Sequence, residues 1–175
     1  MEKAALKEHR RHSTADKPFS YYISNIPEYF PNAPMHWHKE FELNVILEGE
    51  GDFVTGDIHF TAYKGDIVLT PPDMLHAVYQ HDDKRCVYDT LDLDGSMLGS
   101  RDNDRAADAF IAPLILEAYS IETHITPEHC YYSELLTTAE NMISAAKGDT
   151  PLLDMLIKSE LLRFMFLLYE LSLIH

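Results

Sequence analysis

The sequence predicts a mainly β domain, a barrel or a sandwich, followed by a helical region. Between residues 41 and 93, short apolar segments alternate with glycine-containing turns, which is typical of all-β folds. Beyond residue 104 the chain carries helix-start signals and apolar residues at helical spacing instead. The length of 175 residues suits one domain with one core.

The strand predictions rest on alternation and on turn residues. In residues 41–47 the apolar residues at 41, 43, 45 and 47 alternate with Glu42, Asn44 and Ile46, the period of two that a strand with two different faces shows. We expect that strand to break at residues 48–51, and Gly56-Asp57 to form a hairpin turn. Further strands are expected at residues 52–55, 58–63, 67–69, 74–80 and 85–93.

Helices are expected in the last third of the chain. Residues 94–104 are polar and predict a loop, and residues 104–120 predict a helix broken at Pro113. The run Thr126-Pro127-Glu128 predicts a helix over residues 128–147 that stops at Gly148. A last helix is expected from Pro151 to the chain end.

This last helix is apolar on most of its sides, so it needs more than one surface to pack on. The second surface is either the rest of the same chain or a second subunit, and the pattern leaves both open. We expect a homodimer with two-fold symmetry. The candidate contact residues are Phe164, Leu168 and Leu171, and the opposite stripe of Leu162, Phe166 and Tyr169 is the alternative.

Composition and charge exclude several classes of protein. The first seventeen residues lack the apolar core of a secretory signal, and no segment reaches the roughly 20 apolar residues of a membrane span. With two cysteines, expected to be reduced, the sequence predicts a cytoplasmic protein that does not contact membranes. The net charge of −15 repels phosphate backbones, so this chain alone is not expected to bind nucleic acid.

Residues 1–17 differ in charge from the rest of the chain. They hold five basic and three acidic residues, a net charge of +2, which leaves −17 on the remainder. We expect a flexible N-terminal arm here, either a disordered tail or a segment that docks on the acidic body.

The strongest chemical motif is His36-Trp37-His38 followed by Glu42. In an extended strand positions 36, 38 and 42 face one side, and His76 in a neighbouring segment would add a third imidazole. Three histidines and one glutamate suit a divalent transition ion such as Zn, Ni, Fe or Mn. The alternative is a ligand cavity without a native metal. The expected pocket residues are His36, His38, Glu42, Asn44, His76 and Tyr88.

The spacing of these residues resembles the cupin signature. Its first motif is matched by His36, His38, Glu42 and Gly49, and its second by Gly65, Pro71 and His76. The sequence departs from the signature at positions that are not ligands: Phe30 and Asp73 stand at usual glycines, and Gln80 at a usual asparagine. The resemblance implies a double-stranded β-helix barrel over residues 18–104, followed by a helical dimerisation region over residues 105–175 that contains an antiparallel helix pair and belongs to the same compact unit.

Several shorter sequence runs are more specifically similar to the sensor domains of AraC-type transcription regulators. These are the run from His36 to Glu42, the run Gly65-Asp66-Ile67, the pair Pro71-Pro72, and His76. The resemblance implies an effector-binding and dimerisation domain that takes a small molecule into the barrel and signals to a DNA-binding helix-turn-helix domain beyond residue 175. We therefore predict that the chain is not an enzyme. The alternative function is a metal-dependent cupin enzyme, such as a dioxygenase or a sugar isomerase.

Overall fold

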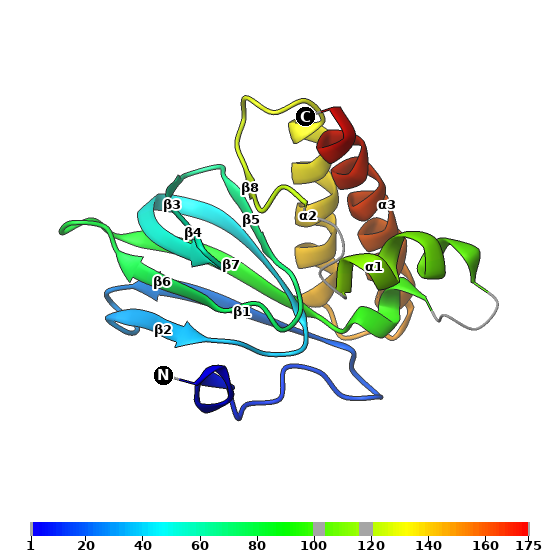
Figure 1. The fold of residues 1–175 in the computed structure, drawn as a ribbon, viewed down its shortest axis with the longest axis horizontal. Coiled ribbons are helices and arrows are strands. Elements are labelled where there is room, and N and C mark those ends of the chain that lie inside the picture. The colour runs from blue at the N-terminus through cyan, green and yellow to red at the C-terminus, as the bar shows by residue number, and fades with distance from the viewer. Residues whose placement is uncertain (1, 100–103, 116–120, 175) are drawn as a thin grey trace.

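One long strand organises the computed structural model, which describes residues 2–99, 104–115 and 121–174 (Figure 1). The first half of β3 (Phe41–Thr55) pairs with β5 (Ile67–Thr70) and β7 (Cys86–Leu93). Its second half pairs with β4 (Ile58–Tyr63) and β6 (His76–Gln80). These two sets of paired strands form the two walls of a barrel. β3 joins the walls because it runs through both of them.

The other strands extend these two walls, and every pairing is antiparallel. β1 (Phe19–Ile26) pairs with β7, and the two-residue β8 (His124–Ile125) pairs with β5. β2 (Asn32–His36) pairs with β6 on the opposite wall. This arrangement, followed by a helix pair, confirms the predicted fold class.

The predicted alternation in β3 is wrong after Val45, and so is the predicted break at residues 48–51. Ile46 is 1% exposed and Leu47 is 39% exposed, the reverse of the expectation. The pairing with β7 shifts register between Ile46 and Glu48, and Gly49 adopts a φ of 74°. A bulge inserts one residue and exchanges the faces, so the strand bends here and continues. The hairpin at Gly56 is confirmed by the pairing of Thr55 with Ile58.

The two faces of the first half of β3 belong to two hydrophobic cores. Phe41, Leu43 and Val45 face the helices, where they join residues such as Leu135 and Leu168. Ile46 faces the barrel interior, where it packs with buried residues of the opposite wall. The barrel interior is therefore separated from the helix-facing core by a single sheet.

In the described part of the chain a short 3-10 helix, η2 (Gly95–Leu98), follows β7 within the predicted loop, and three longer helical segments come after it. The first comprises η3 (Ala107–Ile111) and α1 (Ala112–Ile115), and the predicted break at Pro113 is wrong because the helix continues through it. The π-helical turn of η3 lies just before this proline. The predicted continuation over residues 116–120 lies outside the described residues, as do loop residues 100–103.

The helix pair consists of α2 (Tyr132–Ala146) and α3 (Leu152–Ile174), which lie side by side against the sheet (Figure 1). α2 begins four residues later than the predicted start. The Thr126 amide instead donates a hydrogen bond to the His129 ring in a turn, and Tyr131 has a left-handed φ of 64°. α3 follows its prediction closely. None of the helices in the described part of the chain is long and apolar enough to span a membrane.

The residues of α3 that we expected at a subunit contact are buried within this chain. Phe164, Leu168 and Leu171 are each 0% exposed, because this side of α3 packs on α2 and the barrel of the same chain. They cannot form a contact between subunits. Among the side chains of α3 that the structure describes, the large apolar ones left exposed on the other side are Leu152, Met155, Leu156, Leu162 and Phe166.

The N-terminal arm docks on the barrel, which was one of the two arrangements left open by its sequence. Its short helix η1 (Lys3–Leu6) is followed by a bridge between Lys7 and Trp37. Farther along, His12 is only 7% exposed. The basic arm thus lies across the barrel mouth, close to the acidic groups inside it.

Candidate metal centre and ligand cavity

The four predicted metal ligands converge at one end of the barrel. His36 ends β2, His38 lies in the connection to β3, Glu42 is in β3 and His76 opens β6. One ligand atom from each of these side chains lies within 4.8 Å of those of the other three. The structure differs from the expectation of a single strand, because residues 37–40 separate β2 from β3. The side chains meet because the chain crosses from one wall to the other between them.

Two of the imidazoles are oriented by the backbone. The Nδ1 of His76 donates a hydrogen bond to the carbonyl of Met74 at 2.9 Å, and the Nδ1 of His36 donates to the carbonyl of Pro34 at 2.7 Å. Each ring therefore keeps its Nε2 as the nitrogen with a free lone pair. The Nε2 of His76 is buried and has no hydrogen-bond partner among the described residues. An orphaned buried nitrogen of this kind fits a metal ligand.

Glu42 lies at the centre of the cluster. Its Oε2 is 3.4 Å from the Nε2 atoms of both His38 and His76. Burial alone would raise the pKa of Glu42, but His76 and His38 outweigh burial and lower it well below the usual range. The same carboxylate raises the pKa of His76 against the effect of burial. Glu42 is therefore held as an anion, the form that binds a cation.

A second pair of side chains holds Glu42 in place. The Nδ2 of Asn44 donates a hydrogen bond to Glu42 Oε1 at 2.8 Å, and the Thr90 hydroxyl donates to Asn44 Oδ1 at 2.7 Å. Asn44 is 1% exposed and lies behind the ligand set. Three imidazoles and one oriented carboxylate fit a divalent transition ion, with coordination positions left for water or a small molecule.

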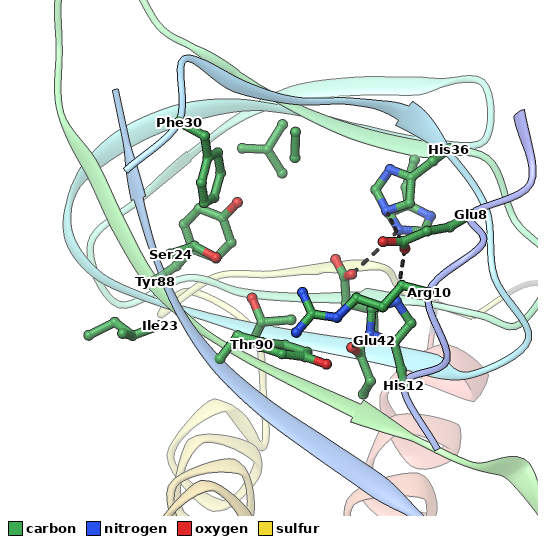
Figure 2. Close-up of a pocket in the computed structure, with 15 residues that line it drawn as sticks. Glu8, Arg10, His12, Ile23, Ser24, Phe30, His36, Glu42, Tyr88 and Thr90 are labelled. Atoms are coloured by element: carbon green, nitrogen blue, oxygen red, sulfur yellow. Dashed lines mark hydrogen bonds and ion pairs between the residues drawn. The ribbon is translucent and has the colours of Figure 1, made fainter. Parts of the chain in front are cut away.

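The ligand set opens into a cavity of about 320 Å³ (Figure 2). Of the expected pocket residues, His36, Glu42, His76 and Tyr88 line it, whereas His38 and Asn44 lie behind its wall. Apolar side chains form the end away from the histidines. The wall is completed by Tyr22, Ile23, Ser24, Phe30, Ala33, Val78, Thr90 and Asp92, and by Glu8, Arg10 and His12 of the arm.

Sequence reasoning missed Asp92 and the three arm residues. Asp92 is 0% exposed at the end of β7, and its Oδ2 lies 2.6 Å from His12 Nδ1. A signal for Asp92 existed, because Tyr88, Thr90 and Asp92 alternate along a strand whose residues are all buried. The arm residues carry no local pattern that points to the cavity.

Trp37, between the two histidines of the motif, is not among the residues that line the cavity. Its indole nitrogen donates a hydrogen bond to the carbonyl of Lys3 at 2.7 Å, and the Lys3 and Lys7 ammonium groups lie over its ring. Trp37 therefore anchors the arm to the outer side of the barrel mouth.

Comparison with known proteins identifies the family. The AraC-like ligand binding domain family matches residues 20–165. An uncharacterized HTH-type transcriptional regulator, YdeC of Bacillus subtilis, is 27% identical over 89 residues. That match covers 50% of this chain and 31% of the regulator, so the chain spans about a third of the relative it matches.

Solved structures with a similar arrangement include two bacterial proteins. A cupin protein from Bacteroides fragilis is 19% identical over 47% of this chain and 71% of its own, with a TM-score of 0.42. The plu4264 protein from Photorhabdus luminescens is 22% identical over 45% of this chain and 65% of its own, with a TM-score of 0.40.

The fold and the family match define a ligand-binding domain of the kind found in transcription regulators. The chain belongs to the AraC-like ligand binding domain family.

Proposed function

We propose that this chain is the sensing and dimerisation part of an AraC-type regulator, and that it binds a small molecule in the barrel cavity. The observation that carries the proposal is a cavity whose wall combines a convergent His/Glu set, apolar residues and the docked arm. Its volume of about 320 Å³ is at the small end for ligand pockets, which favours a small metabolite. A ligand with a polar group at the histidine end and an apolar part toward Phe30 and Val78 fits this wall.

Binding would reach the rest of the regulator through the arm and the helices. Glu8, Arg10 and His12 line the cavity, so a ligand there contacts the arm directly. The sheet that carries Glu42 packs with its other face on α2 and α3. A ligand that shifts this sheet therefore shifts the helix pair, and DNA contact falls to a helix-turn-helix domain of the full regulator.

The test is a thermal-shift screen of sugars, sugar acids and small aromatic acids, followed by variants of one strand. Ala33 lines the cavity, so Ala33→Phe should fill it and abolish the stabilisation by any binding compound. Met35, on the same strand, lines no part of this cavity, and Met35→Phe should leave binding intact. Equal binding by both variants would place the ligand elsewhere and contradict the proposal.

We also propose that His36, His38, Glu42 and His76 hold a divalent transition ion. Metal analysis of a His12→Asn variant, whose arm lacks its buried imidazole, should find about one ion per chain, and adding His76→Ala should lose it because a ligand is removed. His59 is exposed and outside the cluster, so His59→Ala should retain the ion. If metal-free wild-type protein binds none of Zn, Ni, Fe and Mn when they are added, the metal site is contradicted and the site is a ligand cavity without a native metal.

A metal-dependent enzyme is the second candidate function, because the same four side chains converge beside the cavity. The screen separates the two. A sensor returns its bound compound unchanged, whereas an enzyme loaded with metal converts it, which mass spectrometry of the recovered compound detects.

A further inference from the structure

The N-terminal arm brings its own ligating groups to the barrel mouth. The Oε2 of Glu8 lies 2.8 Å from His12 Nε2 and 3.6 Å from His36 Nε2 (Figure 2). The His12 ring centre lies 4.8 Å from that of His38. One ligand atom each from Glu8, His12 and His38 lies within 4.8 Å of the other two. These three residues, the arm cluster, are distinct from the four-residue set except for His38.

The two nitrogens of His12 face different carboxylates. Its Nε2 faces Glu8, whereas its Nδ1 lies 2.6 Å from Oδ2 of the fully buried Asp92. Histidine ligands in metal sites commonly donate their second ring N–H to a carboxylate, which fixes the ring and makes the ligating nitrogen more basic. His12 already has this arrangement, with Asp92 as the carboxylate and Nε2 turned toward Glu8.

Buried acidic groups and imidazoles crowd the same place. Asp92 Oδ2 contacts His12, Asp92 Oδ1 lies 3.9 Å from His38 Nε2, and His38 Nδ1 lies 3.4 Å from Glu40 Oε2. Asp92 also shares the cavity wall with Glu42, the carboxylate at the centre of the other set. A cation bound here would compensate these acidic groups, which are held out of water.

We propose that Glu8, His12 and His38 bind a divalent transition ion, and that this ion ties the arm to the barrel. One carboxylate and two imidazoles suit Zn²⁺ or Co²⁺, with a position left for water. Since two ligands come from the arm and one from the barrel, the ion binds only the docked arm. Docking of the arm, and with it closure of the cavity that Arg10 and His12 line, then depends on metal.

Limited trypsin digestion measures this dependence, because the arm carries cleavage sites after Lys7, Arg10 and Arg11. If cleavage requires the undocked arm, Zn²⁺ at about 100 times its Kd should slow it by about 100-fold relative to chelator-treated protein. His12→Asn and Glu8→Gln should abolish the slowing. His9 is exposed on the same arm, so His9→Asn is the matched control and should keep it.

A double variant, His36→Ala with His76→Ala, removes two ligands of the other set and leaves the arm cluster intact. In this background Zn²⁺ should still slow cleavage, and adding His12→Asn should eliminate the effect. This outcome is independent of the proposed sensing function and of an ion at His36 and His76. Circular dichroism checks folding, and the comparison of wild type with the His9 and His12 variants decides the question if the double variant unfolds.

Two results would overturn the proposal. Cleavage of wild type at the same rate with Zn²⁺ and with chelator would show that the His12–Asp92 pair alone holds the arm. Equal protection by Zn²⁺ in wild type and His12→Asn would assign the effect to another ion position.

Discussion

At the scale of single residues, the two cysteines differ in environment. Cys86 is 0% exposed, and burial raises the pKa of its thiol to about 12, whereas Cys130 is exposed. Only the thiolate reacts, so a thiol reagent at pH 8 should modify one cysteine of native protein quickly and leave Cys86 unmodified. In Cys130→Ser no fast reaction should remain until guanidinium unfolds the chain. Two fast thiols in native wild type would contradict the burial of Cys86.

His81 forms a pH-dependent pair on the outer surface. Its Nδ1 lies 2.8 Å from Asp52 Oδ1, with Glu50 and Asp82 also near the ring, and the bond to Asp52 raises the pKa of His81 above 6.5. A raised pKa in the folded state means that this pair stabilises the fold fully below about pH 6.5, and that the contribution is lost as pH rises through the raised pKa.

An NMR titration of the His81 ring checks this direction. Asp52→Asn should lower the pKa of His81, because it removes the facing charge. Asp57 is exposed at the hairpin turn, so Asp57→Asn should leave the titration unchanged. An Asp52→Asn variant whose His81 titrates as in wild type would rule out the pair.

At the scale of elements, Gly49 in β3 and Gly56 in its hairpin turn require glycine for different physical reasons. Both have positive φ, 74° at Gly49 and 60° at Gly56. A Cβ at Gly49 would lie 1.7 Å from the carbonyl oxygen of Arg85, whereas at Gly56 the nearest atom is Met74 sulfur at 3.5 Å. Gly56→Ala should therefore lower the free energy of unfolding by about 1 kcal/mol, because of backbone strain alone.

Gly49→Ala should lower the free energy of unfolding by more, about 3 kcal/mol or more, because the bulge must open to relieve the clash with the Arg85 carbonyl just before β7. Urea unfolding of the two variants beside wild type measures the difference. Equal losses would mean that the backbone at the bulge moves freely, contrary to its close approach to Arg85.

At the scale of the whole molecule, the exposed apolar stripe of α3 is the proposed dimer contact. Phe166 is 61% exposed and Leu162 42%, so neither is needed by the core of one chain. Phe166→Glu should weaken the dimer by about 30-fold or more, roughly 2 kcal/mol, without lowering the stability of the monomer. Sedimentation at tens of micromolar measures it, with Lys84→Glu, at an exposed position in the turn between β6 and β7, as a control that keeps the dimer.

The opposite stripe should respond differently. Leu168 is 0% exposed within the chain, so Leu168→Glu should unfold the protein, because a carboxylate would be buried without a partner. Wild type that sediments as a 20.1 kDa monomer would refute the dimer, and a folded Leu168→Glu monomer would return the contact to the original stripe.

Much of the fold follows from local sequence patterns. The hairpin at Gly56, the change from strands to helices and the start of α3 depend on residues close together in the chain, so periodicity and turn residues identify them. The four convergent side chains were also found, because their spacing matched a known signature. The start of α2 was placed too early because a good start signal does not exclude the left-handed turn at Tyr131.

What the sequence determined by itself is therefore the strands between residues 41 and 93, the change to helices after them, the family resemblance and the candidate ligands, whereas β1, β2 and β8 were not predicted. Only the tertiary structure decided which stripe of α3 is covered, where β3 bulges, and that Glu8, His12 and Asp92 meet at the cavity. The physical reason is that these features are contacts between segments far apart in the chain. His12 and Asp92 have no local pattern in common, and they meet because β7 and the docked arm share the barrel mouth.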